Sequence, residues 1–294
     1  MDFVIYEKMD CKTKKWSKDC LKVKKWAVTE KVHGANFSFV YSNGEIKYAK
    51  RTGFIKPDEN FYNYQVILPE NLPKINNVVE QVKKLCPEHK MIIVYGELFG
   101  GSYPEFQSKY KPIQRGIYYS PELHFYAFDI YVVEEKLKYY LDFEKSLDIF
   151  KSSGILYAEP MAIFDDLNSA INYPVGFNTG LPKKFGLPEL KINKTEGIVV
   201  KSMTDRYIVK VKIPEFSEIA YTDNSVTTND IYKIAETHIT NNRYDNVVSK
   251  VGEEDKSLIY TMFVEDIMSE LCIDNDKEKK DVKKWLFKQI RGKY

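Results

Sequence analysis

The chain has 294 residues, a length that suits one large domain with a small one, or two domains of ordinary size. With 44% hydrophobic residues, 29% charged residues and a net charge of only +2, its composition is that of a folded globular protein. No stretch approaches the roughly 18 apolar residues that a membrane helix needs. The four cysteines form no CxxC pair and the four histidines are scattered, which argues against a zinc site and a disulfide scaffold.

The charge is uneven along the chain. Residues 1–25 hold eight lysines against four acids, and residues 277–294 hold eight basic residues against two acids. Such segments can contact a phosphate backbone, or they can form an ordinary solvated surface. Residues 1–15 have no apolar segment behind a basic start, and their acids argue against a transit peptide, so a cytosolic location is expected.

In chain order, the first predicted element is a β-hairpin over residues 26–55, because aromatic residues alternate on either side of the turn pair Asn43-Gly44. The next is a helix over residues 61–86, with valines on one side. A second hairpin is predicted around residues 203–205, and the stretch 172–194, rich in proline and glycine, is expected to be loop. The apolar runs that predict buried strands lie at residues 91–99, 124–133, 155–164, 197–202 and 206–213.

The character of the sequence changes near residue 228. From there on, apolar residues recur at helical spacing, for example at Leu258, Met262, Val282 and Leu286. The sequence therefore predicts an α+β protein. A mainly antiparallel N-terminal domain over residues 1–227 precedes a small all-α domain over residues 228–294.

The residues EKVHGAN (30–36) follow the first predicted strand. Lys31 could act as a nucleophile there, because Gly34 allows the backbone to approach a ligand closely. Taken alone, this pattern is weak, since most lysines at strand ends are simply solvated.

Lys210 and Lys212 are two residues apart in a predicted strand, so both point to one face while Val209 and Val211 point to the core. Two adjacent lysines repel each other unless an anion lies between them, and a phosphate is the obvious anion. The alternative is the exposed face of an amphipathic strand.

Three carboxylates lie beside apolar strands. Acids at strand ends next to glycine often cap turns, but together with a lysine pair they could bind ribose hydroxyls and a hydrated divalent cation. These acids are Glu97, Asp129 and Glu196.

Together these pieces resemble the covalent nucleotidyltransferase superfamily of ATP-dependent ligases and capping enzymes. Within it, the KxHGxN pattern is similar to the RNA ligase 2 family, typified by the phage T4 enzyme and the kinetoplastid RNA-editing ligases. The resemblance implies an antiparallel, ATP-grasp-like adenylation domain followed by a helical domain. The segments that carry it, in order, are KVHGAN (31–36), AKR (49–51), YGELFG (95–100), FYAFDIY (125–131), EGIVVK (196–201) and VKVK (209–212).

The resemblance also implies roles for single residues. Lys31 would be adenylated by ATP, Glu97 would bind the ribose, and Phe128 would stack on the adenine. Lys210 and Lys212 would hold the α-phosphate. The implied nucleotide-binding set is Glu30, Lys31, Asn36, Arg51, Glu97, Phe128, Lys210 and Lys212.

Phosphoryl chemistry in this family implies a divalent ion, Mg²⁺ or alternatively Mn²⁺. The implied metal ligands are Asn36, Asp129 and Glu196. His33, Asn36 and Arg51 would act around the phosphates and the RNA 5′ end. The implied catalytic set is Lys31, His33, Glu196, Lys210 and Lys212.

The resemblance thus predicts an ATP-dependent RNA ligase that joins 3′-hydroxyl and 5′-phosphate ends at nicks in duplex RNA, through lysyl-AMP and adenylated RNA. A DNA ligase or a capping guanylyltransferase is the first alternative. Those enzymes normally have KxDG in place of KVHG and carry an OB domain, whereas residues 213–294 have a helical pattern here. The second alternative is a non-catalytic nucleic-acid-binding protein, which would have no need of Lys31.

Overall fold

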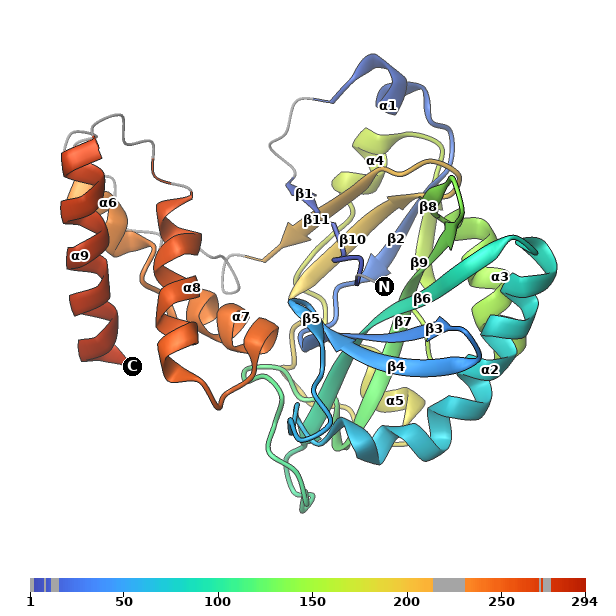
Figure 1. Ribbon diagram of the computed structural model, residues 1–294, viewed down its shortest axis with the longest axis horizontal. Coiled ribbons are helices and arrows are strands. Elements are labelled where there is room, and N and C mark those ends of the chain that lie inside the picture. Colours follow the sequence, from blue (N-terminus) through green and yellow to red (C-terminus); the bar gives the residue numbers. More distant parts are fainter. Residues whose placement is uncertain (1–2, 8, 12–15, 214–230, 270, 272–275) are drawn as a thin grey trace. The chain divides into compact units, whose positions relative to one another are not determined.

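The computed structural model describes residues 3–7, 9–11, 16–213, 231–269, 271 and 276–294. The chain divides into two compact units, Met1–Ile213 and Pro214–Tyr294 (Figure 1). The domain boundary predicted between residues 227 and 228 lies outside the described residues, so its position stays a prediction.

A six-stranded antiparallel sheet forms one half of the first unit. Its strand order is β5-β4-β3-β6-β7-β8. The predicted turn at Asn43-Gly44 joins β3 to β4, and both residues have the positive φ that a two-residue hairpin turn requires, 52° and 84°. The strands are β3 (Ala35–Ser42), β4 (Glu45–Lys50), β5 (Gly53–Phe54), β6 (His89–Ser102), β7 (Ser120–Glu134) and β8 (Lys138–Tyr140).

The second sheet has five strands in the order β1-β11-β10-β2-β9, and only its β1–β11 pair is parallel. The predicted hairpin over residues 26–55 was therefore wrong in extent, because β2 belongs to this sheet and the hairpin is β3–β4. All five residues of β2 are buried, as expected for a strand covered on both faces. The strands are β1 (Asp10–Cys11), β2 (Trp26–Glu30), β9 (Pro160–Phe164), β10 (Gly197–Ser202) and β11 (Ile208–Lys212).

Two helices cover the outer face of the six-stranded sheet (Figure 1). The predicted helix over residues 61–86 is a 3₁₀ turn, η1 (Tyr64–Ile67), followed by α2 (Leu68–Leu85). Helix α3 (Phe143–Ser153) was not predicted, although its buried Phe143 and Phe150 are seven residues apart. The remaining helices of this unit are short: α1 (Lys18–Lys22), α4 (Leu167–Ile171) and α5 (Leu181–Lys184).

Two predictions around residue 160 need correction. The strand predicted over residues 155–164 begins only at Pro160, because proline cannot donate a hydrogen bond and therefore sits at the start of an edge strand. The stretch 172–194 is mostly loop, as predicted, but it contains α5.

The inner faces of the two sheets pack against each other. Val40, Ile93 and Tyr95 of the six-stranded sheet share one apolar cluster with Val199 and Ile208 of the five-stranded sheet. Farther along the same inner faces, polar and charged residues replace the apolar ones, and these residues form the candidate site described below.

The second unit is helical, as predicted, and has a separate apolar core. Three residues of its last helix, Val282, Leu286 and Ile290, are fully buried in that core. Its helices are α6 (Ile231–Thr237), α7 (Asn241–Val251), α8 (Lys256–Met268) and α9 (Asp276–Lys293). Among the described residues, no helix combines the length and the apolar character needed to cross a membrane.

Candidate active site

Lys31 and Glu196 are brought together by strand pairing. Lys31 follows the last residue of β2, Glu196 precedes the first residue of β10, and these strands are antiparallel neighbours. The backbone N–H of Lys31 donates to the carbonyl of Gly197 at 3.0 Å. The Nζ atom of Lys31 then lies 2.7 Å from Oε2 of Glu196, with the two side chains 15% and 2% exposed.

Three basic groups contact the carboxylate of Glu196. Besides Lys31, Nζ of Lys212 lies 3.0 Å from its Oε1, and Nδ1 of His33 lies 3.3 Å from its Oε2. Burial by itself would raise the pKa of this carboxyl, but Lys31 and Lys212 hold the pKa well below its ordinary value. Glu196 is therefore ionised, and it fixes the position of the lysines.

Lys210 and Lys212 share one face of β11, as predicted, and Val209 and Val211 share the other. Val209 and Val211 pack in a cluster with Trp26 and Val28 on the outer side of the five-stranded sheet, so Lys210 and Lys212 point to the inner side. Lys210 is paired across the sheet with Val199 of the inner cluster. The lysine pair therefore borders the space between the sheets.

The six-stranded sheet contributes Glu97 opposite Asn36. Burial raises the pKa of Glu97 to about 7; the charge of Glu196 adds to this shift, while Lys31 and Arg51 oppose it. Gly34 makes this packing possible, because a Cβ there would lie 2.3 Å from the carbonyl oxygen of Leu98. The two carboxylates thus interact unfavourably, a situation that a bound cation would relieve.

Asn36 offers an unused acceptor. Its Oδ1 is buried and has no hydrogen-bond partner among the described residues, and such atoms in native proteins usually mark a missing ligand, ion or water. Arg51, just after β4, lies with its guanidinium carbon 5.8 Å from the centre of the Tyr6 ring, and burial lowers its pKa. The Oδ1 of Asn36 therefore suits a hydrogen-bond donor or a cation, and Arg51 suits an anionic group.

Asp129 and Glu30 are engaged by the protein itself. Asp129 accepts a hydrogen bond from Tyr6 and lies 2.9 Å from Nζ of Lys201. Glu30 accepts from the hydroxyl of Thr179 and, at 3.4 Å, from a backbone N–H. Asp129 and Glu196 thus have separate partners, and the metal role predicted for Asn36, Asp129 and Glu196 stays a prediction. Among the described residues, no group of three or more His, Cys, Asp or Glu side chains could hold a metal ion.

The family model for RNA ligase matches residues 24–212 of this chain. The chain belongs to the RNA ligase family. RNA-editing ligase 2, mitochondrial, from Trypanosoma brucei brucei is 30% identical, and the match covers 78% of this chain and 70% of that protein. The RNA ligase predicted from the sequence is thereby confirmed, in preference to a DNA ligase or a capping enzyme.

Two further matches to this RNA ligase cover a smaller share of the matched protein. RNA-editing ligase 1, mitochondrial, from the same organism is 31% identical over 217 residues, so the chain spans 46% of it. A Naegleria gruberi RNA ligase variant solved with ATP and Mn has a TM-score of 0.46 and 16% identity, covering 66% of this chain and 51% of that one.

Several residues around the site of the ligase were not predicted. The hydroxyl of Tyr119 accepts from the backbone N–H of His33 at 2.9 Å, and Gln114 donates to the carbonyl of Gly34 at 3.1 Å. Both come from the loop between β6 and β7, and no local pattern points to them. Lys201 could have been found, because it ends EGIVVK and alternation places it on the same face as Val199.

Proposed function

We propose that this RNA ligase carries AMP on Lys31, consumes ATP with a divalent cation, and joins RNA 3′-hydroxyl and 5′-phosphate ends. The observation that carries the proposal is the short contact between Lys31 and Glu196, with Lys212 on the other oxygen of the same carboxylate. A nucleophile and a phosphate-binding cation are thereby held side by side, at the edge of the space between the two sheets.

In the first step, the lone pair of Nζ of Lys31 attacks the α-phosphorus of ATP after the ammonium has released its proton to solvent. A P–N bond forms, the bond to the oxygen shared with the β-phosphate breaks, and pyrophosphate leaves with that electron pair. Lys212 and Lys210 stabilise the negative charge on the α-phosphate oxygens as the bonds change.

Two transfers complete the reaction. An oxygen of the RNA 5′-phosphate attacks the phosphorus of the lysyl-AMP, and Lys31 leaves and regains a proton. The RNA 3′-hydroxyl then loses its proton and attacks the activated 5′-phosphorus, so that AMP is released with the electron pair of the broken P–O bond. Each step is an in-line displacement at phosphorus, and one set of lysines can therefore serve all three.

The residues of this site fit a divalent cation that takes only a few of its ligands from the protein. Mg²⁺ is usually bound through one or two carboxylates, substrate phosphates and waters. Glu196, whose carboxylate also pairs with Lys31 and Lys212, and the unpartnered Oδ1 of Asn36 would hold it, while Asp129 stays with Lys201 and Tyr6. When bound, such an ion neutralises charge on the phosphates.

The nucleotide would lie between the sheets. Glu97 is the acceptor for the ribose hydroxyls, Phe128 provides the ring for the adenine, and Arg51 with His33 faces the phosphates. Glu30 supports the site through the loop it binds, because its carboxylate accepts hydrogen bonds from Thr179 and the next residue.

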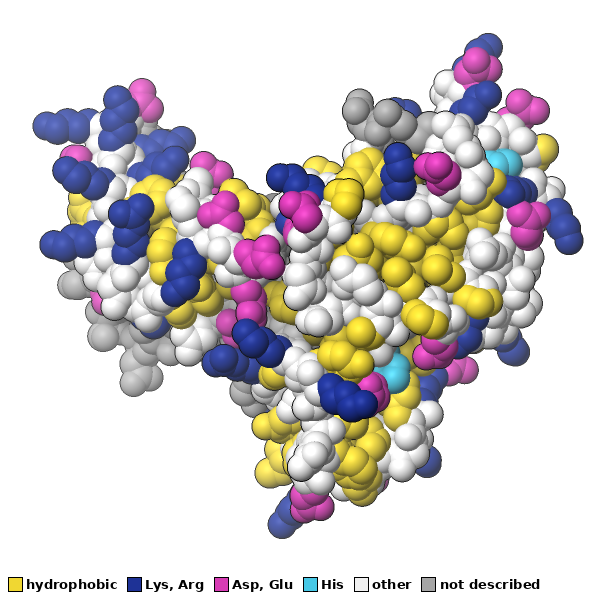
Figure 2. Space-filling model, turned by 60° about the horizontal axis from the view of Figure 1, so that its bottom comes forward, with side chains coloured by type: hydrophobic (Ala, Val, Ile, Leu, Met, Phe, Trp, Pro, Cys, Tyr) yellow, Lys and Arg dark blue, Asp and Glu magenta, His cyan; other side chains and the backbone are white. Residues whose placement is uncertain are grey.

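The helical unit engages the RNA. In α9, Val282, Leu286 and Ile290 are buried in the core of that unit, while eight lysine and arginine side chains are exposed. Figure 2 shows many such side chains over the surface of this unit. A surface of this kind contacts phosphates regardless of sequence. Domains over residues 1–227 and 228–294 would thus divide chemistry from RNA binding.

Nicks in duplex RNA are the expected substrate. A cytosolic location stays a prediction, whereas the trypanosome relatives are named mitochondrial.

The test is sealing of a nicked RNA duplex with a labelled 5′-phosphate, in the presence of ATP and Mg²⁺. We expect a full-length product that disappears when EDTA replaces Mg²⁺, and an adenylated RNA intermediate at early times. A matched nick with DNA on both sides measures preference for RNA ends. Absence of sealing together with absence of lysyl-AMP would contradict the proposed function.

A further inference from the structure

Phe128 lies at an irregularity of β7. In the pairing of β6 with β7, Tyr95 is opposite Asp129 and the next residue, Gly96, is opposite Ala127, so Phe128 has no partner across the ladder. An extra residue of this kind is a β-bulge, which leaves backbone groups outside the ladder and turns a side chain in a new direction. The carbonyl of a buried bulge residue needs a donor from elsewhere.

Lys201 of the other sheet supplies that donor. Its Nζ donates to the carbonyl oxygen of Phe128 at 2.7 Å, and it lies 5.3 Å from the centre of the Phe128 ring. The side chain of Lys201 is only 3% exposed. A lysine is seldom buried to this degree without a partner that compensates its charge.

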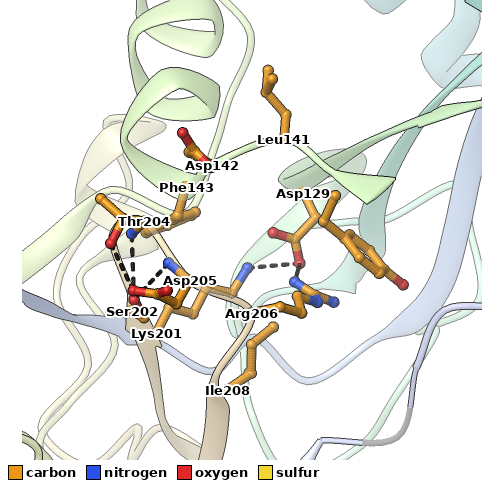
Figure 3. Close-up of a pocket in the computed structure, with 11 residues that line it drawn as sticks. Asp129, Leu141, Asp142, Phe143, Lys201, Ser202, Thr204, Asp205, Arg206 and Ile208 are labelled. Atoms are coloured by element: carbon orange, nitrogen blue, oxygen red, sulfur yellow. Dashed lines mark hydrogen bonds and ion pairs between the residues drawn. The ribbon is translucent and has the colours of Figure 1, made fainter. Parts of the chain in front are cut away.

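Asp129 is that partner. Its Oδ2 lies 2.9 Å from Nζ of Lys201 and 3.3 Å from Nη1 of Arg206, and it accepts a hydrogen bond from Tyr6. Figure 3 shows Lys201 and Arg206 converging on the carboxylate of Asp129 from the hairpin β10–β11. The ring of Tyr6 in turn contacts the ring of Phe128 edge-on, with centroids 5.0 Å apart.

We infer that Lys201 is a positioning residue for Phe128, and that Asp129 anchors Lys201 instead of binding a metal ion. The inference rests on the proposed function, in which the Phe128 ring receives the adenine. Lys201 holds the bulge carbonyl, and the bulge directs the ring into the space between the sheets. Because the tether comes from β10, the same strand that begins beside Glu196, it also links the base-binding ring to the strand that holds the nucleophile.

The test is a double-mutant cycle on lysyl-AMP formation. The rate of self-adenylylation is measured against ATP concentration for wild type, Lys201→Met, Phe128→Leu and the double variant. Lys201→Met should raise the KM for ATP about tenfold, with the rate at saturating ATP within about twofold of wild type. In the Phe128→Leu background, Lys201→Met should raise the KM for ATP by less than about twofold further, because Lys201 acts through the Phe128 ring, which this background lacks.

Two further variants sharpen the result. Lys201→Arg, which can still donate to the carbonyl and pair with Asp129, should restore the KM to within about threefold of wild type. Lys25→Met breaks an exposed lysine–carboxylate pair, Lys25–Glu144 at 3.2 Å, and should leave the KM unchanged.

The Asp129→Asn variant tests whether Asp129 anchors Lys201 or binds the metal ion. It should raise the KM for ATP and leave the half-saturating Mg²⁺ concentration unchanged. An increased Mg²⁺ requirement would overturn the assignment of Asp129. Equal effects of Lys201→Met in both Phe128 backgrounds, or no effect in either, would overturn the role of Lys201. A wild-type protein that forms no lysyl-AMP would instead refute the proposed function.

Discussion

The ammonium nitrogen of Lys31 lies 2.7 Å from Oε2 of Glu196, although 165 residues separate the two in the chain. Their contact depends on the antiparallel register of β2 and β10, in which Glu30 is opposite Ile198. A slip of one residue would turn the alternating side chains of one strand to the opposite face. The register of these two strands therefore determines whether Lys31, the proposed nucleophile, lies beside Glu196.

Lys31 should be the residue that receives AMP. Incubation with α-³²P-ATP and Mg²⁺ should label wild-type protein, and Lys31→Ala should abolish the label because the variant has no amine to form the P–N bond. Labelling is read by denaturing electrophoresis, with α-³²P-GTP as the control nucleotide. A label that survives in Lys31→Ala would refute this nucleophile, and preferred labelling by GTP would indicate capping chemistry.

Glu196→Gln should slow lysyl-AMP formation by about a hundredfold or more while the fold survives. The substitution keeps the shape of the side chain but removes the charge that holds Lys31 and Lys212. Single-turnover adenylylation and circular dichroism measure the two effects separately. A rate near that of wild type would show that the carboxylate is dispensable.

Lys210→Ala and Lys212→Ala should each fail chiefly at phosphate chemistry. Both lysines point away from the apolar face of β11, so their removal leaves the packing of Val209 intact. We expect unchanged thermal unfolding with a large loss of adenylylation in both variants. Normal adenylylation in either variant would identify that lysine as an ordinary surface charge.

Glu97 should make the stability of the ligase depend on pH. Burial raises its pKa from 4.5 to about 7, so between these values the folded protein binds more protons than the unfolded chain, and stability falls as the pH rises. In the Glu97→Gln variant the side chain cannot ionise, so the variant does not lose stability in this way as the pH rises. The free energy of unfolding of the variant relative to wild type should increase by about 2 to 3 kcal/mol from pH 5 to pH 8. Urea titrations at both pH values measure the difference, and a constant difference would contradict it.

A chain ending at residue 227 should still form lysyl-AMP but should seal 5′-phosphate RNA poorly. The site residues lie in the unit Met1–Ile213, whereas α9 belongs to the other unit. As a matched control, glutamine at Lys283, Lys284 and Lys288 in the full-length chain removes exposed charge and keeps the buried residues of α9. This variant should lose salt-sensitive RNA binding and retain adenylylation. Parallel loss of adenylylation and folding in the truncated chain would show that the helical unit only stabilises the first.

The features that could be predicted from the sequence are those with local causes. The turn at Asn43-Gly44, the inward face of Lys210 and Lys212, and the helical tail each follow from neighbouring residues. Helix α3 had the same kind of signal, with Phe143 and Phe150 on one side, and could have been found.

The features that could not be predicted depend on pairing between distant segments. No local pattern in residues 26–30 shows that β2 leaves the first hairpin and joins the other sheet. The role of Asp129 is similar: its apolar neighbours indicate a buried acid, but whether a metal ion or Lys201 neutralises it depends on which strand lies opposite.

The strand order of the two sheets has a consequence for the synthesis of the chain. The six-stranded sheet uses only residues 35–140, so its strands can pair while the later residues are still being added. The five-stranded sheet joins strands from residue 10 to residue 212, and β2 lacks its neighbour β10 until residues 197–202 have left the ribosome. Because Glu196 and Lys212 arrive last, a nascent ligase cannot assemble the surroundings of Lys31 until almost the entire first unit is made. The first unit therefore becomes able to react with ATP only when its own folding is nearly finished.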